Sequence, residues 1–278
     1  MNPSIMIDFR VINQAQFVSA KRLWGAAIGA KLLIFSLGVW AVFIGPPVTY
    51  LPQIILALLV LSEILQLRSD DKKSRAEGLL RTLDVCSLFS HEISIADKRD
   101  IVCNVPRNLR KRFEGKNMQD LYFSNSHQEG PQRAVENLLE SAWYTRHQAG
   151  LMVGLYISLI IGLLALSILT LIFALREIDS NELKDQVVKV VTACLLLIVS
   201  LNMFKAAWSY FKMYQRCQKT ENICEHLLRD DVTMADAQKQ WYEYQLTRAT
   251  SPLLPQWLWK IRGSSLDDAW HRACGKNG

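Results

Sequence analysis

The sequence predicts an all-α membrane protein in which four transmembrane helices form two hairpins and the other segments build a mainly helical cytoplasmic domain. First, half of the 278 residues are hydrophobic and the mean hydropathy is +0.08, although 21% are charged. Second, the apolar residues gather in four runs, each close to the length that crosses a hydrocarbon core of about 30 Å. Third, Lys and Arg are concentrated in alternate connecting segments, as the positive-inside rule requires.

The four apolar runs differ in strength as predictions of spans. The third is the surest, because it contains 26 residues without a charge. The first contains Lys31, and the second is short and contains Glu63, so a buried core helix is the alternative for the second. No cleavable secretory signal is expected, because residues 1–20 lack a continuous apolar region. The runs are residues 23–45, 51–67, 150–175 and 187–204.

The charges of the connecting segments predict the orientation. The connector between the first two runs has no charged residue, and the one between the last two has two cations against four acids. Fourteen Lys and Arg residues lie between the second and third runs, and eleven follow from Lys205 onward. We therefore expect a multi-pass membrane protein with both termini in the cytoplasm. The predicted order is cytoplasmic residues 1–22, hairpin 23–67, cytoplasmic residues 68–148, hairpin 149–207 and cytoplasmic residues 208–278.

Two opposite charges interrupt the first hairpin at the same depth. Lys31 lies about 21 Å of helix inside Gly45, the outer end of the first run, and Glu63 lies about 20 Å inside Tyr50. An unpaired charge at mid-span costs about 2.5 to 3.5 kcal/mol, so such residues usually pair or face water. We expect Lys31 and Glu63 to be partners, within one chain or between subunits. The alternative is that the long Lys31 side chain reaches the inner headgroups by itself.

Small residues recur every four positions on two of the predicted spans. Such a stripe lets another helix approach closely, so it predicts helix packing. The partner is either the other hairpin of the same chain, which is slightly favoured, or another copy of the chain. The stripe residues are Gly25 and Gly29 on the first span, and Gly150, Gly154, Ser158 and Gly162 on the third.

The cytoplasmic segments are predicted to be mainly helical. A helix continues from the second run, and a helix beginning at Pro131 leads into the third run. Two further helical patterns cover residues 210–228 and 233–248, whereas residues 91–105 alternate as in a strand or a loop.

The end of the tail contains three tryptophans, at positions 257, 259 and 270. We favour a place for them in the core of a small helical domain. The alternative is a position at the inner membrane interface, beside Lys260 and Arg262.

The densest basic cluster is RNLRKRF, residues 107–113. Contact with anionic lipid headgroups is the favoured interpretation, because each cation near the surface contributes about 1 kcal/mol. Binding of a phosphorylated small molecule, or more weakly of RNA, is the alternative. DNA binding is not expected, because the net charge of +6 is distributed over the predicted cytoplasmic segments, as the membrane topology alone would require. The residues assigned to this contact are Arg107, Arg110, Lys111, Arg112 and Arg133.

No catalytic, cofactor or metal motif occurs in the sequence. There is no P-loop, GxGxxG, HExxH, GxSxG or paired CxxC, and the five histidines are scattered singly, so we expect neither an enzyme nor a cofactor. Cys217, Cys224 and His226 are too loosely spaced for a zinc site. The six cysteines lie outside the predicted outer loops and are expected to be free thiols.

Two short hairpins separated by about 80 cytoplasmic residues resemble the four-transmembrane effector family of CBASS-type (SMODS-associated) bacterial phage-defence systems. Three phrases resemble that family as well: QAQFVSAKRLW from Gln14, LLRTLDVCSLF, and DLYFSNSHQEGPQRAVENLLESAWYTRHQ. The resemblance covers most of the chain, and the architecture carries more of it than any motif. The third phrase includes Gln132, Arg133, Asn137, Trp143 and Tyr144.

This resemblance implies an effector that oligomerises in the inner membrane when infection is signalled and then permeabilises or depolarises that membrane. The implied partners are the lipid bilayer, further copies of the chain, and a nucleotide second messenger or a partner defence protein. The alternative is a membrane-anchored sensor or scaffold whose hairpins only tether a cytoplasmic binding domain.

Overall fold

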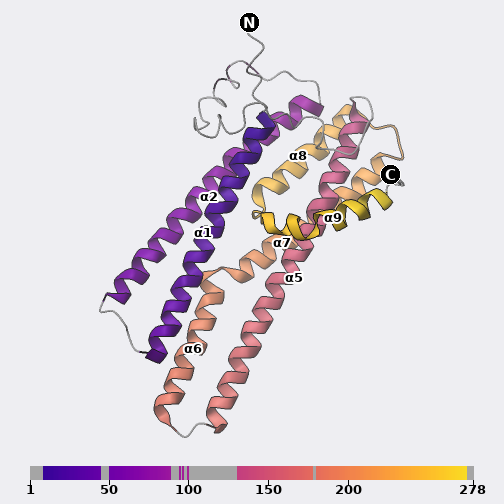
Figure 1. Cartoon of the computed structure of the whole chain (residues 1–278). Coiled ribbons are helices and arrows are strands. Elements are labelled where there is room, and N and C mark those ends of the chain that lie inside the picture. Colours follow the sequence, from indigo (N-terminus) through magenta and orange to yellow (C-terminus); the bar gives the residue numbers. More distant parts are fainter. Residues whose placement is uncertain are drawn as a thin grey trace. The chain divides into compact units, whose positions relative to one another are not determined.

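The computed structural model describes residues 9–44, 50–88, 94, 96, 99, 130–177 and 180–273. Within these residues every regular element is a helix and no strand occurs, which confirms the predicted all-α class (Figure 1). Most of the stretch 91–105, expected to be a strand or a loop, lies outside the described residues. The helices are α1 (Phe9–Ile44), α2 (Leu51–Leu88), α5 (Pro131–Glu177), α6 (Asn181–Ser200), α7 (Met203–Leu227), α8 (Met234–Thr250) and α9 (Gln256–Ala273).

Four helical stretches are long and apolar enough to cross a membrane, as the hydropathy of the sequence predicts. Only 6% to 22% of the most apolar part of each stretch is buried inside the chain. The remaining apolar surface, such as Leu169 and Phe173 with about two thirds of their area exposed, therefore suits contact with lipid. The four stretches are Phe9–Val42, Leu51–Cys86, Pro131–Ala174 and Leu183–Leu227.

The chain divides into two compact units. Unit 2 consists of Arg22–Ser69 and Gly150–Phe211 and contains the four apolar runs. Unit 1 consists of Met1–Lys21, Asp70–Ala149 and Lys212–Gly278. Because α1, α2, α5 and α7 each continue from one unit into the other, three separate segments of the chain meet in unit 1.

The core of unit 1 joins α8 to α5. Trp241 is almost fully buried, and its Nε1–H donates to the carbonyl of Ala134 at 2.8 Å. One turn later on α8, the Tyr244 hydroxyl donates to the carbonyl of Ser141 at 3.0 Å. Helix α8 begins at a capped end, because the Thr233 hydroxyl accepts the backbone N–H of Asp236. Residues more than 100 positions apart are thereby fixed together in one domain.

The core of unit 2 lies around a break in the fourth apolar run. Helix α6 ends at Ser200 and α7 begins at Met203, although the run 187–204 is uniformly apolar enough to predict one continuous helix. Asn202 has φ of 49°, a left-handed conformation that Asn tolerates better than most residues. Met203 packs with Ile160 and Ile198 directly beside this break.

The orientation of the chain can be tested with introduced cysteines. In a variant whose six native cysteines are replaced, we expect Ser180→Cys, between α5 and α6, to react with a membrane-impermeant maleimide in intact cells. Asp231→Cys, between α7 and α8, should react only after lysis. Both positions are exposed, so the reverse labelling pattern would contradict the predicted topology.

Candidate functional site

Lys31 and Glu63 lie together in unit 2. The Lys31 Nζ is 2.9 Å from the Glu63 Oε1, and it also donates to the backbone carbonyl of Ser200 at 3.3 Å. The three groups come from α1, α2 and α6. The lysine therefore has two acceptors, a carboxylate and a carbonyl, within the apolar part of the chain. We call these three groups the intramembrane polar centre.

The break after α6 explains why a carbonyl is available to Lys31. The last four carbonyls of a helix receive no hydrogen bond from the helix itself, because no further turn follows to supply the N–H groups. In a hydrocarbon environment such a carbonyl costs free energy unless another group donates to it. Because Ser200 is the last residue of α6, its carbonyl is one of these, and the ammonium of Lys31 satisfies it.

The two charged side chains of the polar centre differ sharply in exposure. The side chain of Lys31 is 12% exposed, whereas that of Glu63 is 57% exposed. The neighbours of Glu63 on α2 are exposed apolar side chains, among them Val60 and Ile64. The polar centre thus presents a carboxylate on an otherwise apolar helix surface.

In the part of the chain that the structure describes, most of the small residues in the two stripes do not pack against another helix. A Cβ atom built on Gly25, Gly29, Gly154 or Gly162 meets no atom of the described structure within 4 Å. Ser158 is exposed as well, and only Gly150 is half-buried. The slightly favoured interpretation, packing within the chain, therefore does not account for most of the stripe.

The predicted basic contact is only partly described. Arg107, Arg110, Lys111 and Arg112 lie outside the described residues. Arg133 lies in the first turn of α5 and is half-buried.

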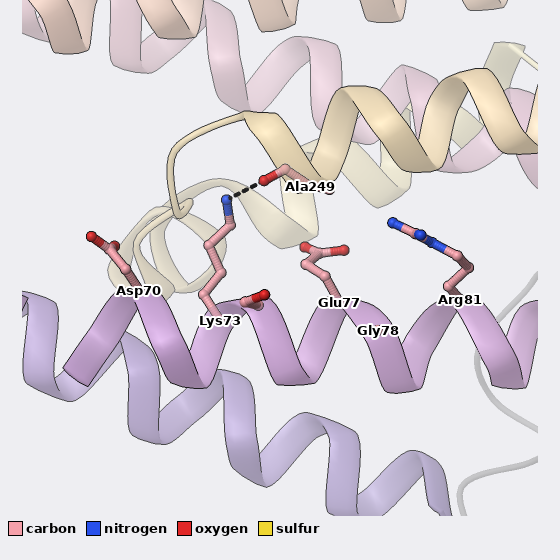
Figure 2. A pocket seen from close by; sticks show the side chains of 7 residues that line it. Asp70, Lys73, Glu77, Gly78, Arg81 and Ala249 are labelled. Atoms are coloured by element: carbon pink, nitrogen blue, oxygen red, sulfur yellow. Dashed lines mark hydrogen bonds between the residues drawn. The ribbon is translucent and has the colours of Figure 1, made fainter. Parts of the chain in front are cut away.

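A charged groove of about 430 Å³ lies in unit 1, on the face of α2 beside the end of α8 (Figure 2). Lys73 points from α2 to α8, where its Nζ donates to the carbonyl of Ala249 at 3.0 Å and also to that of Ser251. Glu77 accepts from Arg248 of α8 at 3.5 Å. Burial lowers the pKa of Lys73. The lining residues are Asp70, Lys73, Ser74, Glu77, Gly78, Arg81 and Ala249.

The sequence contains a signal for this groove that a search for catalytic motifs does not detect. Asp70, Lys73, Glu77 and Arg81 follow one another at spacings of three or four residues, which places acids and bases on one face of a helix. Such a row is usually solvated. Here α8 covers part of it, and this depends on folding of the tail.

Two carboxyl groups of unit 1 are buried beside cations. Asp84 lies seventeen residues beyond Leu67, outside the apolar run, and is 3% exposed. Its desolvation raises its pKa to about 6, against the opposing effects of Arg248 and Arg10. Glu221 lies 3.1 Å from Arg146, and desolvation raises its pKa to about 7.

Two of the cysteines in unit 1 are deeply buried. Cys217 and Cys224 are fully buried, and desolvation raises the pKa of each thiol to about 12, so neither forms a reactive thiolate at neutral pH. Among the described residues, no three His, Cys, Asp or Glu side chains lie close enough to hold a metal ion.

No protein-family model, curated protein or solved structure matches this chain. Its function must therefore be inferred from the polar centre, the small-residue stripes and the charged groove.

The coupling between Lys31 and Glu63 can be measured with Lys31→Met, Glu63→Gln and the double variant. Because each single change leaves one polar partner in an apolar environment, we expect the double variant to be about 1–2 kcal/mol more stable than the sum of the single effects predicts. Unfolding of the purified chain in mixed micelles gives these free energies. The exposed pair Asp71 and Arg75, 3.0 Å apart, is the control and should show a coupling below about 0.5 kcal/mol. Additive effects at Lys31 and Glu63 would contradict the pairing.

The buried carboxyls predict how stability depends on pH. Both pKa values are raised in the folded chain, so the folded chain binds more protons than the unfolded chain between about pH 4 and pH 7. Unfolding free energy should therefore fall as pH rises through this window. The contribution of Asp84 is on the order of 3 kcal/mol. Thermal unfolding between pH 4 and pH 8 measures it.

Asp84→Asn should flatten this pH dependence, because it removes the buried ionisable group while keeping its size. The control is Asp71→Asn on the same helix, whose side chain is 56% exposed and which should leave the profile unchanged. A wild-type profile in the Asp84 variant would show that this carboxyl does not control the pH dependence.

Proposed function

We propose that this chain is an oligomerising effector of the bacterial inner membrane, which permeabilises or depolarises the membrane when a cytoplasmic trigger acts on it during phage infection. The observation that carries the proposal is the exposed carboxylate of Glu63 on an apolar helix surface. The resemblance to four-transmembrane defence effectors gives the biological setting.

The exposure of Glu63 favours a change of state in the membrane. Lys31 supplies one partner, but more than half of the Glu63 side chain remains uncovered by its own chain. A carboxylate that faces hydrocarbon is costly. A polar group of a neighbouring copy can pair with it, or a column of water can solvate it. Association of several copies around Glu63 would place a polar lining where each copy alone meets lipid.

The uncovered glycines supply surfaces for such an association. Gly154, Ser158 and Gly162 lie on α5, and Gly25 and Gly29 lie on α1. Without side chains at these positions, a helix of another copy can approach the backbone closely and gain dispersion contacts. The chain thus has two faces suited to packing against further copies, one on α1 and one on α5.

Helix α2 connects a place for a trigger to the polar centre. Lys73 in the charged groove and Glu63 in the polar centre lie ten residues apart on this one continuous helix. An anionic nucleotide or a partner protein that competed for Lys73 or Arg81 would shift the register of α2 against α8. Such a shift would be transmitted along the helix to Glu63.

A membrane-anchored sensor is the second candidate, because unit 1 has a core and a groove of its own. The two candidates differ in what the polar centre must do. A pore needs Lys31 and Glu63 to meet water, whereas a tether does not.

The decisive experiment records membrane potential with a voltage-sensitive dye in bacteria that express the chain with its genomic neighbours under phage challenge. We expect depolarisation that depends on infection and is lost in the variant Lys31→Leu with Glu63→Leu. The control variant, Asp71→Leu with Arg75→Leu, removes an equivalent pair at exposed positions and should retain depolarisation. Equal amounts of each variant in the membrane fraction are required. An unchanged potential throughout infection would refute the pore and favour the sensor.

A further inference from the structure

The three tryptophans near the end of the chain occupy two different environments. Trp270 is 8% exposed and packs against Trp143, with ring centroids 5.3 Å apart. Trp257 and Trp259 are 44% and 45% exposed, and Ile261 is 67% exposed. The preferred interpretation, a place in the core for all three tryptophans, is therefore correct only for Trp270.

The exposed residues at the beginning of α9 combine apolar and basic side chains. Lys260 and Arg262 alternate with Trp259 and Ile261, and both cations are exposed. No acidic residue occurs before Asp267 on this helix. Trp257, Lys260 and Ile261 are spaced three or four residues apart and therefore share one face of the helix, which we call the α9 face, whereas Trp259 and Arg262 lie on the other side.

Two contacts within unit 1 join the beginning of α9 and the residues before it to α5 and α2, two helices that continue into apolar runs. Trp259 contacts Tyr144 of α5, with ring centroids 5.6 Å apart, and Tyr144 lies six residues before the run that starts at Gly150. Ser251, just before α9, accepts from Lys73 of α2, which lies six residues after Leu67. Six residues of helix span about 9 Å. Tyr144 and Lys73, the partners of Trp259 and Ser251, thus each lie about 9 Å along their own helix from the predicted end of an apolar run.

The position of Trp259 is fixed by its own helix. A Cβ atom at residue 263 would lie 3.1 Å from Cε2 of the indole, so Gly263 leaves room for the ring to lie along the next turn. Asp267, one turn further on, accepts from the Tyr144 hydroxyl at 2.7 Å. These contacts hold α9 against α5 while Trp257 and Ile261 stay uncovered.

We propose that the α9 face binds the anionic headgroup region of the cytoplasmic leaflet of the membrane that the chain spans. Tryptophan rings favour the level of the headgroups, where an apolar body and an N–H donor are both accommodated. Lys260 and Arg262 complement the negative charge of anionic lipids. The α9 face, with Lys260 beside Trp257 and Ile261, would lie against the interface, and the exposed Arg262 would reach the headgroups from the flank of the helix.

The test measures immersion of position 261 in the full-length chain in nanodiscs. A keto amino acid incorporated at position 261 carries a nitroxide, so the native cysteines stay in place. Collision with oxygen, which partitions into lipid, is compared with collision with a water-soluble nickel chelate. We expect the oxygen-to-nickel ratio at 261 to be several-fold higher than at 234 in nanodiscs of phosphatidylcholine and phosphatidylglycerol. Met234, at the far end of α8, is a matched control because it is an exposed apolar residue as well.

Two further arms separate the outcomes. In the variant Lys260→Gln with Arg262→Gln, or without phosphatidylglycerol, the ratio at 261 should fall towards the value at 234. An elevated ratio that depends on neither change would overturn the assignment to anionic lipid. A ratio at 261 equal to that at 234 would overturn membrane binding altogether, and shielding from both reagents would indicate a second protein surface instead. The labelled chains must unfold at the wild-type temperature. None of these outcomes depends on pore formation.

Discussion

The requirement to satisfy polar groups in hydrocarbon controls the structure around Lys31. Its ammonium serves both the carboxylate of Glu63 and the carbonyl at the end of α6. Each of these acceptors would be costly without a donor, and the ammonium would be costly without them. One cation therefore makes two irregularities tolerable, an acid on α2 and a break in the fourth apolar run. Met203 packs with Ile160 and Ile198 beside that break.

In unit 1, charged side chains and helix-end carbonyls are likewise paired, but by several weaker contacts. Arg248 lies between Glu77 and Asp84, and its guanidinium also lies 6.0 Å from the centre of the Tyr244 ring. The same helix contributes the carbonyl of Ala249 to Lys73. Helix α8 is therefore fixed by its charges and helix-end carbonyls on one side and by Trp241 and Tyr244 on the other. A domain assembled from three chain segments needs contacts of both kinds.

The hydropathy of the sequence was sufficient to predict the helical class and the four apolar helices. Counting residues from the outer end of each run was sufficient to predict that Lys31 and Glu63 lie at the same depth in the first hairpin. The break at Asn202 was not predictable, because one Asn in an apolar run changes neither hydropathy nor periodicity enough to mark a helix end. The charged groove was missed for a different reason. It exists only when α8 returns to α2, and the row of charges on α2 does not show that a segment about 175 positions away will cover it. The three tryptophans near the end of the chain differ in burial although they are the same residue type, because tertiary packing alone decides which of them is covered.

The unequal exposure of Lys31 and Glu63 restricts the symmetry of the proposed assembly. The ammonium of Lys31 is largely buried and the carboxylate of Glu63 is exposed, so the pair forms a negative patch on the surface of the chain. A two-fold axis through that patch would oppose identical charges across a self-complementary contact. A ring, in which the patches of several copies face a shared column of water, separates these charges and solvates them. Cyclic closure with more than two copies is accordingly the arrangement that suits Glu63.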